Sequence, residues 1–103
     1  MKQIAILGLG RFGRALARTL VEMGHDVMGV DANEAVVEKM APVLTNCVQA
    51  DVMDEQTLLS LGVTNFDIVV VGIGNSDMQA SIFTTLMLKE MGVEHVVCKV
   101  SSN

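Results

Sequence analysis

Tryptophan and tyrosine are absent from this sequence, and three phenylalanines are its only aromatic residues. The hydrophobic core must therefore be built from Val, Leu, Ile, Ala and Met. Only 18% of the 103 residues are charged and half are hydrophobic, a composition typical of globular rather than disordered chains. The length suits one domain, residues 1–103, and excludes a nucleotide-binding domain followed by a substrate domain.

Cysteine and basic residues are also scarce. Cys47 and Cys98 are far apart and form no CxxC pair, so the sequence signals neither a zinc site nor a disulfide framework, and reduced thiols suit the cytosol. The net charge of −5 argues against nucleic-acid binding, which requires a basic face, so an anionic ligand needs local donors. The apolar run FDIVVVGIG is too short to span a bilayer. We expect a soluble, cytoplasmic chain.

Five short apolar runs alternate with helical patterns along the chain. The runs are KQIAIL, DVMGV, CVQA, DIVVV and HVVCKV. Such alternation predicts parallel strands joined by crossover helices, and runs that are apolar throughout predict strands covered on both faces. The sequence therefore predicts an α/β fold: a Rossmann-like, doubly wound parallel sheet of about five strands in the order 3-2-1-4-5.

The last predicted helix, DMQASIFTTLMLKEM, is apolar around more than one stripe. Its large apolar side chains cannot all face one sheet, so part of the helix is expected to meet something else. Pairing with a second copy across a dimer interface is the preferred interpretation, because large exposed apolar patches usually mark contacts. The alternative is a plainly apolar surface.

A glycine-rich turn follows the first predicted strand. Gly8, Gly10 and Gly13 form GxGxxG at the start of the first helix. In that context Gly8 allows a tight turn, Gly10 lets a pyrophosphate approach the backbone, and Gly13 lets the helix pack closely on the sheet. The N–H groups of the helix start would face the phosphates. The alternative is a glycine turn that only packs a strand–helix corner.

Asp31 ends the second predicted strand, about twenty residues after the glycine turn. A carboxylate at this point can accept hydrogen bonds from the ribose hydroxyls of an adenine nucleotide, and it would repel a 2′-phosphate, which makes NADP unlikely as a ligand. The alternative is a surface aspartate that leads into a turn, with Asn33 as the cap of the next helix. The motif and the spacing together favour nucleotide binding.

The remaining candidates for the site lie at the predicted carboxyl edge of the sheet. Arg11 is placed to reach phosphate unless it is simply solvated, and Asp51 with Val52 could line the base pocket. Lys99 points either to the phosphate crevice or to the exposed end of its strand. The complete predicted site comprises Gly8, Gly10, Arg11, Phe12, Gly13, Asp31, Asn33, Asp51, Val52, Gly72, Gly74 and Lys99.

Catalysis is not expected within this chain. The sequence holds no GxxxxGK[ST] loop, and a dehydrogenase needs a proton-transfer group beside the nicotinamide. His25 and His95 each precede a strand, on the edge away from the predicted site, and no soft-ligand cluster indicates a metal. We therefore expect neither catalytic nor metal-binding residues. The alternative function is the cofactor domain of an NAD-dependent oxidoreductase.

Several segments together resemble one family of regulatory domains. They are AILGLGRFG, MGHDVMGVDANE, ADVMDE, LGVTNFDIVVVGIG, QASIFTTLMLKEMGV and VVCKV. They are similar to the KTN domain, also called the RCK or TrkA N-terminal domain, of Trk and Ktr potassium transport systems and ligand-gated potassium channels. The resemblance covers essentially the entire chain, and GLGRFG with the following VDxNE is its most specific part.

The resemblance implies a regulator of potassium transport. It implies a Rossmann-like domain that forms dimers or an octameric ring against the cytosolic face of a potassium-transporting membrane subunit, and that binds ATP, ADP, NAD or NADH. It matches the glycines and Arg11 to the phosphate loop, Asp31 to the ribose carboxylate, and Lys99 to a lysine near the phosphates. It further implies a longer protein, with a sixth strand and often a C-terminal subdomain that this chain lacks.

Overall fold

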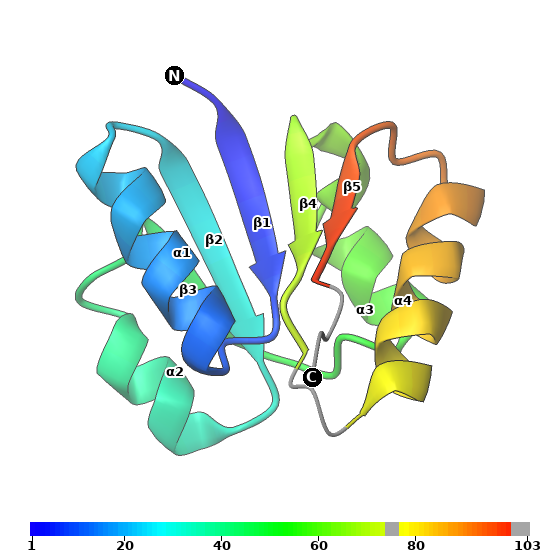
Figure 1. The fold of residues 1–103 in the computed structure, drawn as a ribbon, viewed down its shortest axis with the longest axis horizontal. Helices are drawn as coiled ribbons and strands as arrows, with labels where there is room; N and C mark the ends of the chain where they lie inside the picture. The colour runs from blue at the N-terminus through cyan, green and yellow to red at the C-terminus, as the bar shows by residue number, and fades with distance from the viewer. Residues whose placement is uncertain (74–76, 100–103) are drawn as a thin grey trace.

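The computed structural model describes residues 1–73 and 77–99 of the chain. Strands and helices alternate almost without exception (Figure 1). The strands are β1 (Gln3–Leu7), β2 (Asp26–Asp31), β3 (Asn46–Gln49), β4 (Ile68–Val71) and β5 (Val96–Cys98). The helices are α1 (Arg11–Glu22), α2 (Glu34–Met40), α3 (Glu55–Ser60) and α4 (Met78–Glu90), with a short 3-10 helix η1 (Val63–Asn65).

All five strands form one parallel sheet in the order β3-β2-β1-β4-β5. This confirms the predicted order. The chain leaves β1 toward β2 and β3 and then returns to the other side of β1 as β4, so the strand order reverses between β1 and β4. Open sheets of this kind bind ligands at such a reversal, outside the carboxyl ends of the strands.

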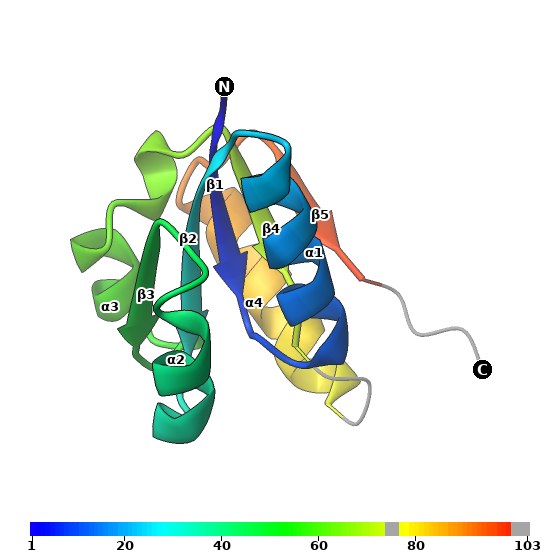
Figure 2. The ribbon, with the colours of Figure 1, turned by 90° about the vertical axis from the view of Figure 1, so that its left-hand side faces the viewer.

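The helices cover the two faces of the sheet in pairs, α1 and α2 on one face and α3 and α4 on the other (Figures 1 and 2). Side chains of β1 alternate accordingly, because successive residues of a strand point to opposite faces. Ile4 and Ile6 belong to the buried cluster that includes Ala17 of α1, whereas Ala5 and Leu7 belong to the cluster that includes Leu88 of α4. Burial on both faces explains why the strand runs are apolar throughout.

Turn and cap residues mark where helices begin or end, at positions that the sequence indicates. Gly24 follows α1 with φ of 93°, a left-handed conformation that favours glycine. The Asn33 side chain caps α2 by accepting hydrogen bonds from the amides of Ala35 and Val36. These local signals fix where each crossover begins and ends, and so where its strands emerge.

Helix α4 buries one face and exposes another that is equally apolar. Met87 and Leu88 are buried against the sheet. On the opposite side, four large apolar residues are each 51–60% exposed: Met78, Ile82, Phe83 and Leu86. The expectation that this helix is apolar around more than one stripe is therefore confirmed.

The described segments contain no helix that is both long enough and apolar enough to cross a membrane.

Candidate nucleotide-binding site

A cavity of about 240 Å³ opens at the carboxyl ends of the strands, where the strand order reverses. The register places Leu7, Val30 and Val71 in one row across three neighbouring strands, so the loops that follow them converge. The cavity is lined by Gly8, Gly10, Asp31, Ala32, Val52, Gly72 and Ile73. Five of these residues belong to the predicted site.

Three glycines of this corner are required by the protein backbone itself. A Cβ on Gly13 would fall onto the carbonyl oxygen of Gly8, and one on Gly72 would lie 2.8 Å from the same atom. Gly8 has φ of 99°, and a Cβ there would approach the backbone of Gly72 and Ile73 to 2.9 Å. The β1–α1 turn, the start of α1 and the end of β4 are therefore in contact through backbone atoms alone.

Gly10 differs from these three glycines. A Cβ at Gly10 would meet nothing closer than the Gly72 carbonyl oxygen at 3.9 Å, and its φ of −71° is open to any residue. The fold therefore does not require glycine at this position. Because Gly10 lines the cavity, the missing side chain leaves space that a ligand can fill.

The start of α1 leaves backbone donors beside that space. The Arg14 amide donates to the Gly10 carbonyl at 2.9 Å. The capping residue of α1 is Gly10, which has no side chain to bond to the amides of residues 11–13. The first N–H groups of a helix have no partner within the helix, and they attract anions together with the helix dipole. This is the usual arrangement for holding a phosphate.

The carboxylate of Asp31 is held in place by two backbone amides. One of its oxygens accepts a hydrogen bond from the Leu9 amide at 2.7 Å, and the other accepts from the Asn33 amide at 2.9 Å. An ionised carboxylate has about four acceptor positions, so two such bonds leave capacity for ribose hydroxyls. The bond to Leu9 also ties the end of β2 to the glycine turn.

Of the predicted residues Asn33, Asp51 and Val52, only Val52 lines the cavity. Val52 lies in the cavity wall beside Ala32. The side chain of Asp51 instead accepts a hydrogen bond from the Met53 amide at 2.9 Å and stabilises a turn on the surface. Asn33 caps α2 and contributes its backbone amide to Asp31.

Three predicted residues lie beside the cavity rather than in its wall. Arg11 and Phe12 are exposed on the first turn of α1. The ammonium of Lys99, which follows β5, lies 5.4 Å from the centroid of the Phe12 ring. Neither sequence alternative for Lys99 included this contact.

One predicted residue cannot be placed, and two residues of the cavity wall were not predicted. Gly74 lies outside the described residues. Ala32 and Ile73 line the cavity and were missed, although each directly follows a predicted position, Asp31 or Gly72. An apolar residue after a strand carries no chemical signal of its own, so only its place at the strand end could have indicated it.

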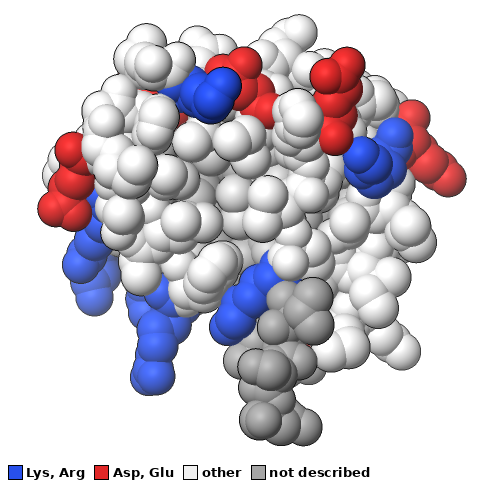
Figure 3. Space-filling view, turned by 45° about the horizontal axis from the view of Figure 1, so that its top comes forward, with Lys and Arg blue, Asp and Glu red and all other residues white. Residues whose placement is uncertain are grey.

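Basic side chains gather near this end of the molecule. Figure 3 shows Lys and Arg at the lower left and lower middle of the view, and further Lys or Arg side chains at the top and upper right beside acidic ones. Helix α1 contributes Arg11, Arg14 and Arg18, which share one side of the helix at spacings of three and four residues. In a chain with net charge of −5, Arg11 puts a positive charge next to Gly10 of the cavity wall, whereas the Arg18 guanidinium lies 3.9 Å from the sulfur of Met40 in α2.

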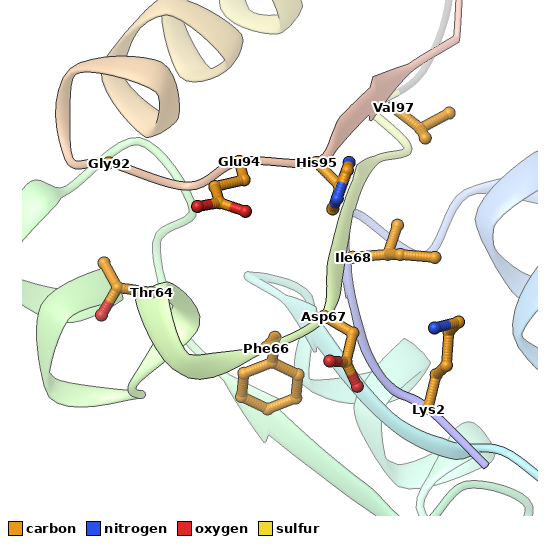
Figure 4. Close-up of a pocket in the computed structure, with 9 residues that line it drawn as sticks. All are labelled: Lys2, Thr64, Phe66, Asp67, Ile68, Gly92, Glu94, His95 and Val97. Carbon is orange, nitrogen blue, oxygen red and sulfur yellow. The ribbon is translucent and has the colours of Figure 1, made fainter.

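A larger cavity, of about 610 Å³, lies at the opposite, amino edge of the sheet (Figure 4). Its lining mixes charged, polar and apolar residues from the segment before β1, from η1 to the start of β4, and from the loop before β5 into β5: Lys2, Thr64, Phe66, Asp67, Ile68, Gly92, Glu94, His95 and Val97. Asp67 there accepts a hydrogen bond from the Gln3 amide at 2.8 Å. No residue of the predicted site lies in it. Among the described residues, no three His, Cys, Asp or Glu side chains are grouped so that they could hold a metal ion.

The parallel sheet, the glycine turn and the carboxylate at the end of β2 define a Rossmann-like domain. The solved NAD(P)-binding domain of an exopolyphosphatase-related protein from Archaeoglobus fulgidus has this fold, with a TM-score of 0.85 at 22% identity, over 99% of this chain and 75% of that one. The chain belongs to the TrkA-N domain family, whose model matches residues 4–103.

Two curated relatives come from Bacillus subtilis (strain 168). The chain is 45% identical to Ktr system potassium uptake protein A over 101 residues, and 43% identical to Ktr system potassium uptake protein C over 102 residues. The matches cover 98% and 99% of this chain but only 45% and 46% of the relatives. The chain thus spans about half the length of the curated relatives it matches.

Proposed function

We propose that this domain binds an adenine nucleotide, ATP, ADP, NAD or NADH, in the cavity at the carboxyl edge of the sheet. The observation that carries the proposal is that Gly10 and Asp31 line the same cavity. Gly10 keeps space open over the amides at the start of α1, although the fold does not require glycine there. Asp31 presents a carboxylate that two backbone hydrogen bonds hold in place. The pyrophosphate would lie over Gly10 and the start of α1, and the ribose hydroxyls would bond to Asp31.

The role of the bound nucleotide is regulation of a potassium uptake system. The support is family membership together with the names of the Ktr relatives, which are potassium uptake proteins. The described site offers phosphate and ribose contacts but no group suited to proton transfer in the cavity wall, whose only ionisable side chain is Asp31. In this proposal the domain works in the cytosol, against a potassium-transporting membrane subunit.

Signalling requires that the nucleotide favours one arrangement of the assembled domains over another. A ligand shifts an equilibrium only by its difference in affinity for the two states. In our proposal, two nucleotides with different preferences bias a dimer or ring, and that change of shape is transmitted to the membrane subunit.

The exposed face of α4 is the surface proposed for pairing with a second copy. Met78, Ile82 and Leu86 are four residues apart, so they form one stripe along the helix, and Phe83 flanks it. Two such stripes related by a two-fold axis would bury each other, because an isologous interface uses the same patch on both subunits. A further cavity lies between the start of α3 and α4, and its lining includes Phe83 and Leu86. The exposed Met53 also lines this cavity and so extends the apolar patch.

Thermal unfolding of the domain with ATP, ADP, NAD, NADH and NADP in turn tests the ligand. A ligand at about one hundred times its dissociation constant adds roughly 2.7 kcal/mol to the free energy of unfolding. We expect stabilisation by the adenine nucleotides and none by NADP, whose 2′-phosphate would meet the Asp31 carboxylate. Stabilisation by NAD and NADH alone would favour the cofactor domain of an oxidoreductase, and no effect from any of the five would contradict nucleotide binding.

A charge placed in the α4 stripe tests the dimer. Ile82→Lys should shift the mass measured by light scattering from dimer to monomer, since an unpaired charge in an apolar interface costs several kcal/mol. Ala15→Lys, on the exposed side of α1, adds the same charge elsewhere and should leave the dimer intact. A wild-type monomer, or equal effects of the two variants, would overturn this part of the proposal.

A further inference from the structure

Lys99 and Phe12 come from opposite ends of the chain and meet beside the glycine turn. The ammonium of Lys99 lies 5.4 Å from the centroid of the Phe12 ring. At this separation the electron-rich face of the ring attracts a cation. Phe12 belongs to the first turn of α1, and Lys99 directly follows β5, so two fixed elements bring the pair together.

The backbone fixes the base of the Lys99 side chain. Its amide donates to the carbonyl of Val71 at 3.3 Å, which extends the pairing of β4 and β5 one residue beyond Cys98. Val71 is followed by Gly72, which lines the cavity. The partly buried stem of Lys99 therefore starts next to the cavity wall, and its ammonium ends over the first turn of α1.

The start of α1 is an unfavourable place for a cation by itself. The helix dipole is positive there, and Arg11 adds a positive charge one residue before Phe12. Both repel an ammonium, whereas the face of the Phe12 ring attracts it. The same concentration of positive charge becomes favourable when a pyrophosphate lies at the helix start.

We propose that Phe12 is a positioning residue whose ring holds the Lys99 ammonium at the start of α1, so that the nucleotide pyrophosphate meets a cation already in place. The inference rests on the proposed function, because it assigns a role within the same site. A lysine without the ring would have to be ordered when the ligand binds, and ordering a flexible side chain lowers affinity. The ring therefore contributes to phosphate binding without touching phosphate.

A double-mutant cycle on ADP binding tests this role. Calorimetry would give the dissociation constant of ADP for wild type, Phe12→Leu, Lys99→Met and the double variant. We expect each single substitution to weaken binding about three- to fivefold, and Phe12→Leu to cause no further loss once Lys99 is removed. Additive losses would mean that Phe12 acts through the structure of α1, and would overturn the inference.

Two further readouts separate positioning from folding. Phe12→Tyr keeps an aromatic face and should keep the wild-type affinity for ADP; a loss equal to that of Phe12→Leu would contradict the proposal. In the ligand-free wild type, the ε-methylene protons of Lys99 should show an upfield ring-current shift by NMR, and its absence would overturn the contact without any variant. If wild type does not bind ADP, the proposed function fails; if it binds ADP and the cycle is additive, only the role of Phe12 fails.

Discussion

The two edges of the sheet carry cavities of opposite character. The amino-edge cavity is the larger, about 610 Å³ against about 240 Å³, and side chains from several loops line it. Backbone contacts among glycines build the smaller one, and a single carboxylate is fixed in its wall. In our proposal the smaller cavity holds the nucleotide, so cavity volume is not what selects the site. Donors and acceptors that the backbone fixes before the ligand arrives are the better guide.

The first prediction separates two glycines of the carboxyl edge. Gly13→Ala should destabilise the domain by on the order of 3 kcal/mol or more, because its Cβ meets the rigid Gly8 carbonyl. Gly10→Ala should leave the melting temperature within a few degrees of wild type while it abolishes nucleotide stabilisation. Thermal unfolding with and without ADP measures both effects. Equal destabilisation by the two variants would show that Gly10 also serves only the fold.

The second prediction sets one aspartate of each edge against the other. Asp31 accepts backbone hydrogen bonds of 2.7 and 2.9 Å on its two oxygens and Asp67 accepts one of 2.8 Å, so Asp67→Asn removes a hydrogen-bonded carboxylate of the same kind at the other edge. Asp31→Asn should weaken ADP binding roughly ten- to a hundredfold, since charge-assisted hydrogen bonds contribute about 1.5–3 kcal/mol. Asp67→Asn should leave the affinity unchanged. A larger loss from Asp67→Asn in calorimetric titrations would place the ligand at the amino edge.

The smallest effect concerns the thiol of Cys47. Burial raises the pKa of this thiol, and the negative charge of Asp31 raises it further. The reactive thiolate should therefore form at higher pH than in an exposed cysteine, so alkylation of Cys47 should begin at higher pH. Asp31→Asn should speed alkylation of Cys47 at pH 8, measured by peptide mass spectrometry, whereas Asp67→Asn should not. Equal rates in the two variants would contradict the electrostatic link.

The sequence predicts the framework of the site better than its details. Strand order, the glycine turn and the position of Asp31 follow from apolar runs, glycine spacing and the edge at which parallel strands end, and these depend on the backbone. The turn made by the Asp51 side chain and the contact of Lys99 with Phe12 depend on side-chain conformation. No periodic signal in the chain encodes such contacts, so they appear only in the structure.

The sequence also predicts that α4 is apolar on two sides but not which residues are exposed. Met87 and Phe83 have similar hydropathy, yet Met87 is buried and Phe83 is half exposed. Their places are set by how α4 is rotated about its axis when Leu88 and Val93 pack against the sheet. That rotation is a property of the assembled core rather than of the helix sequence.

The measurement that tests the central claim most directly is an NMR titration of the amide resonances with ADP. The account predicts chemical-shift changes at the carboxyl edge, at residues 8–13, 31–33, 52, 72–73 and 99, with the resonances of 64–68 and 92–97 unchanged. Changes concentrated at the amino edge, or no saturable change at all, would contradict it.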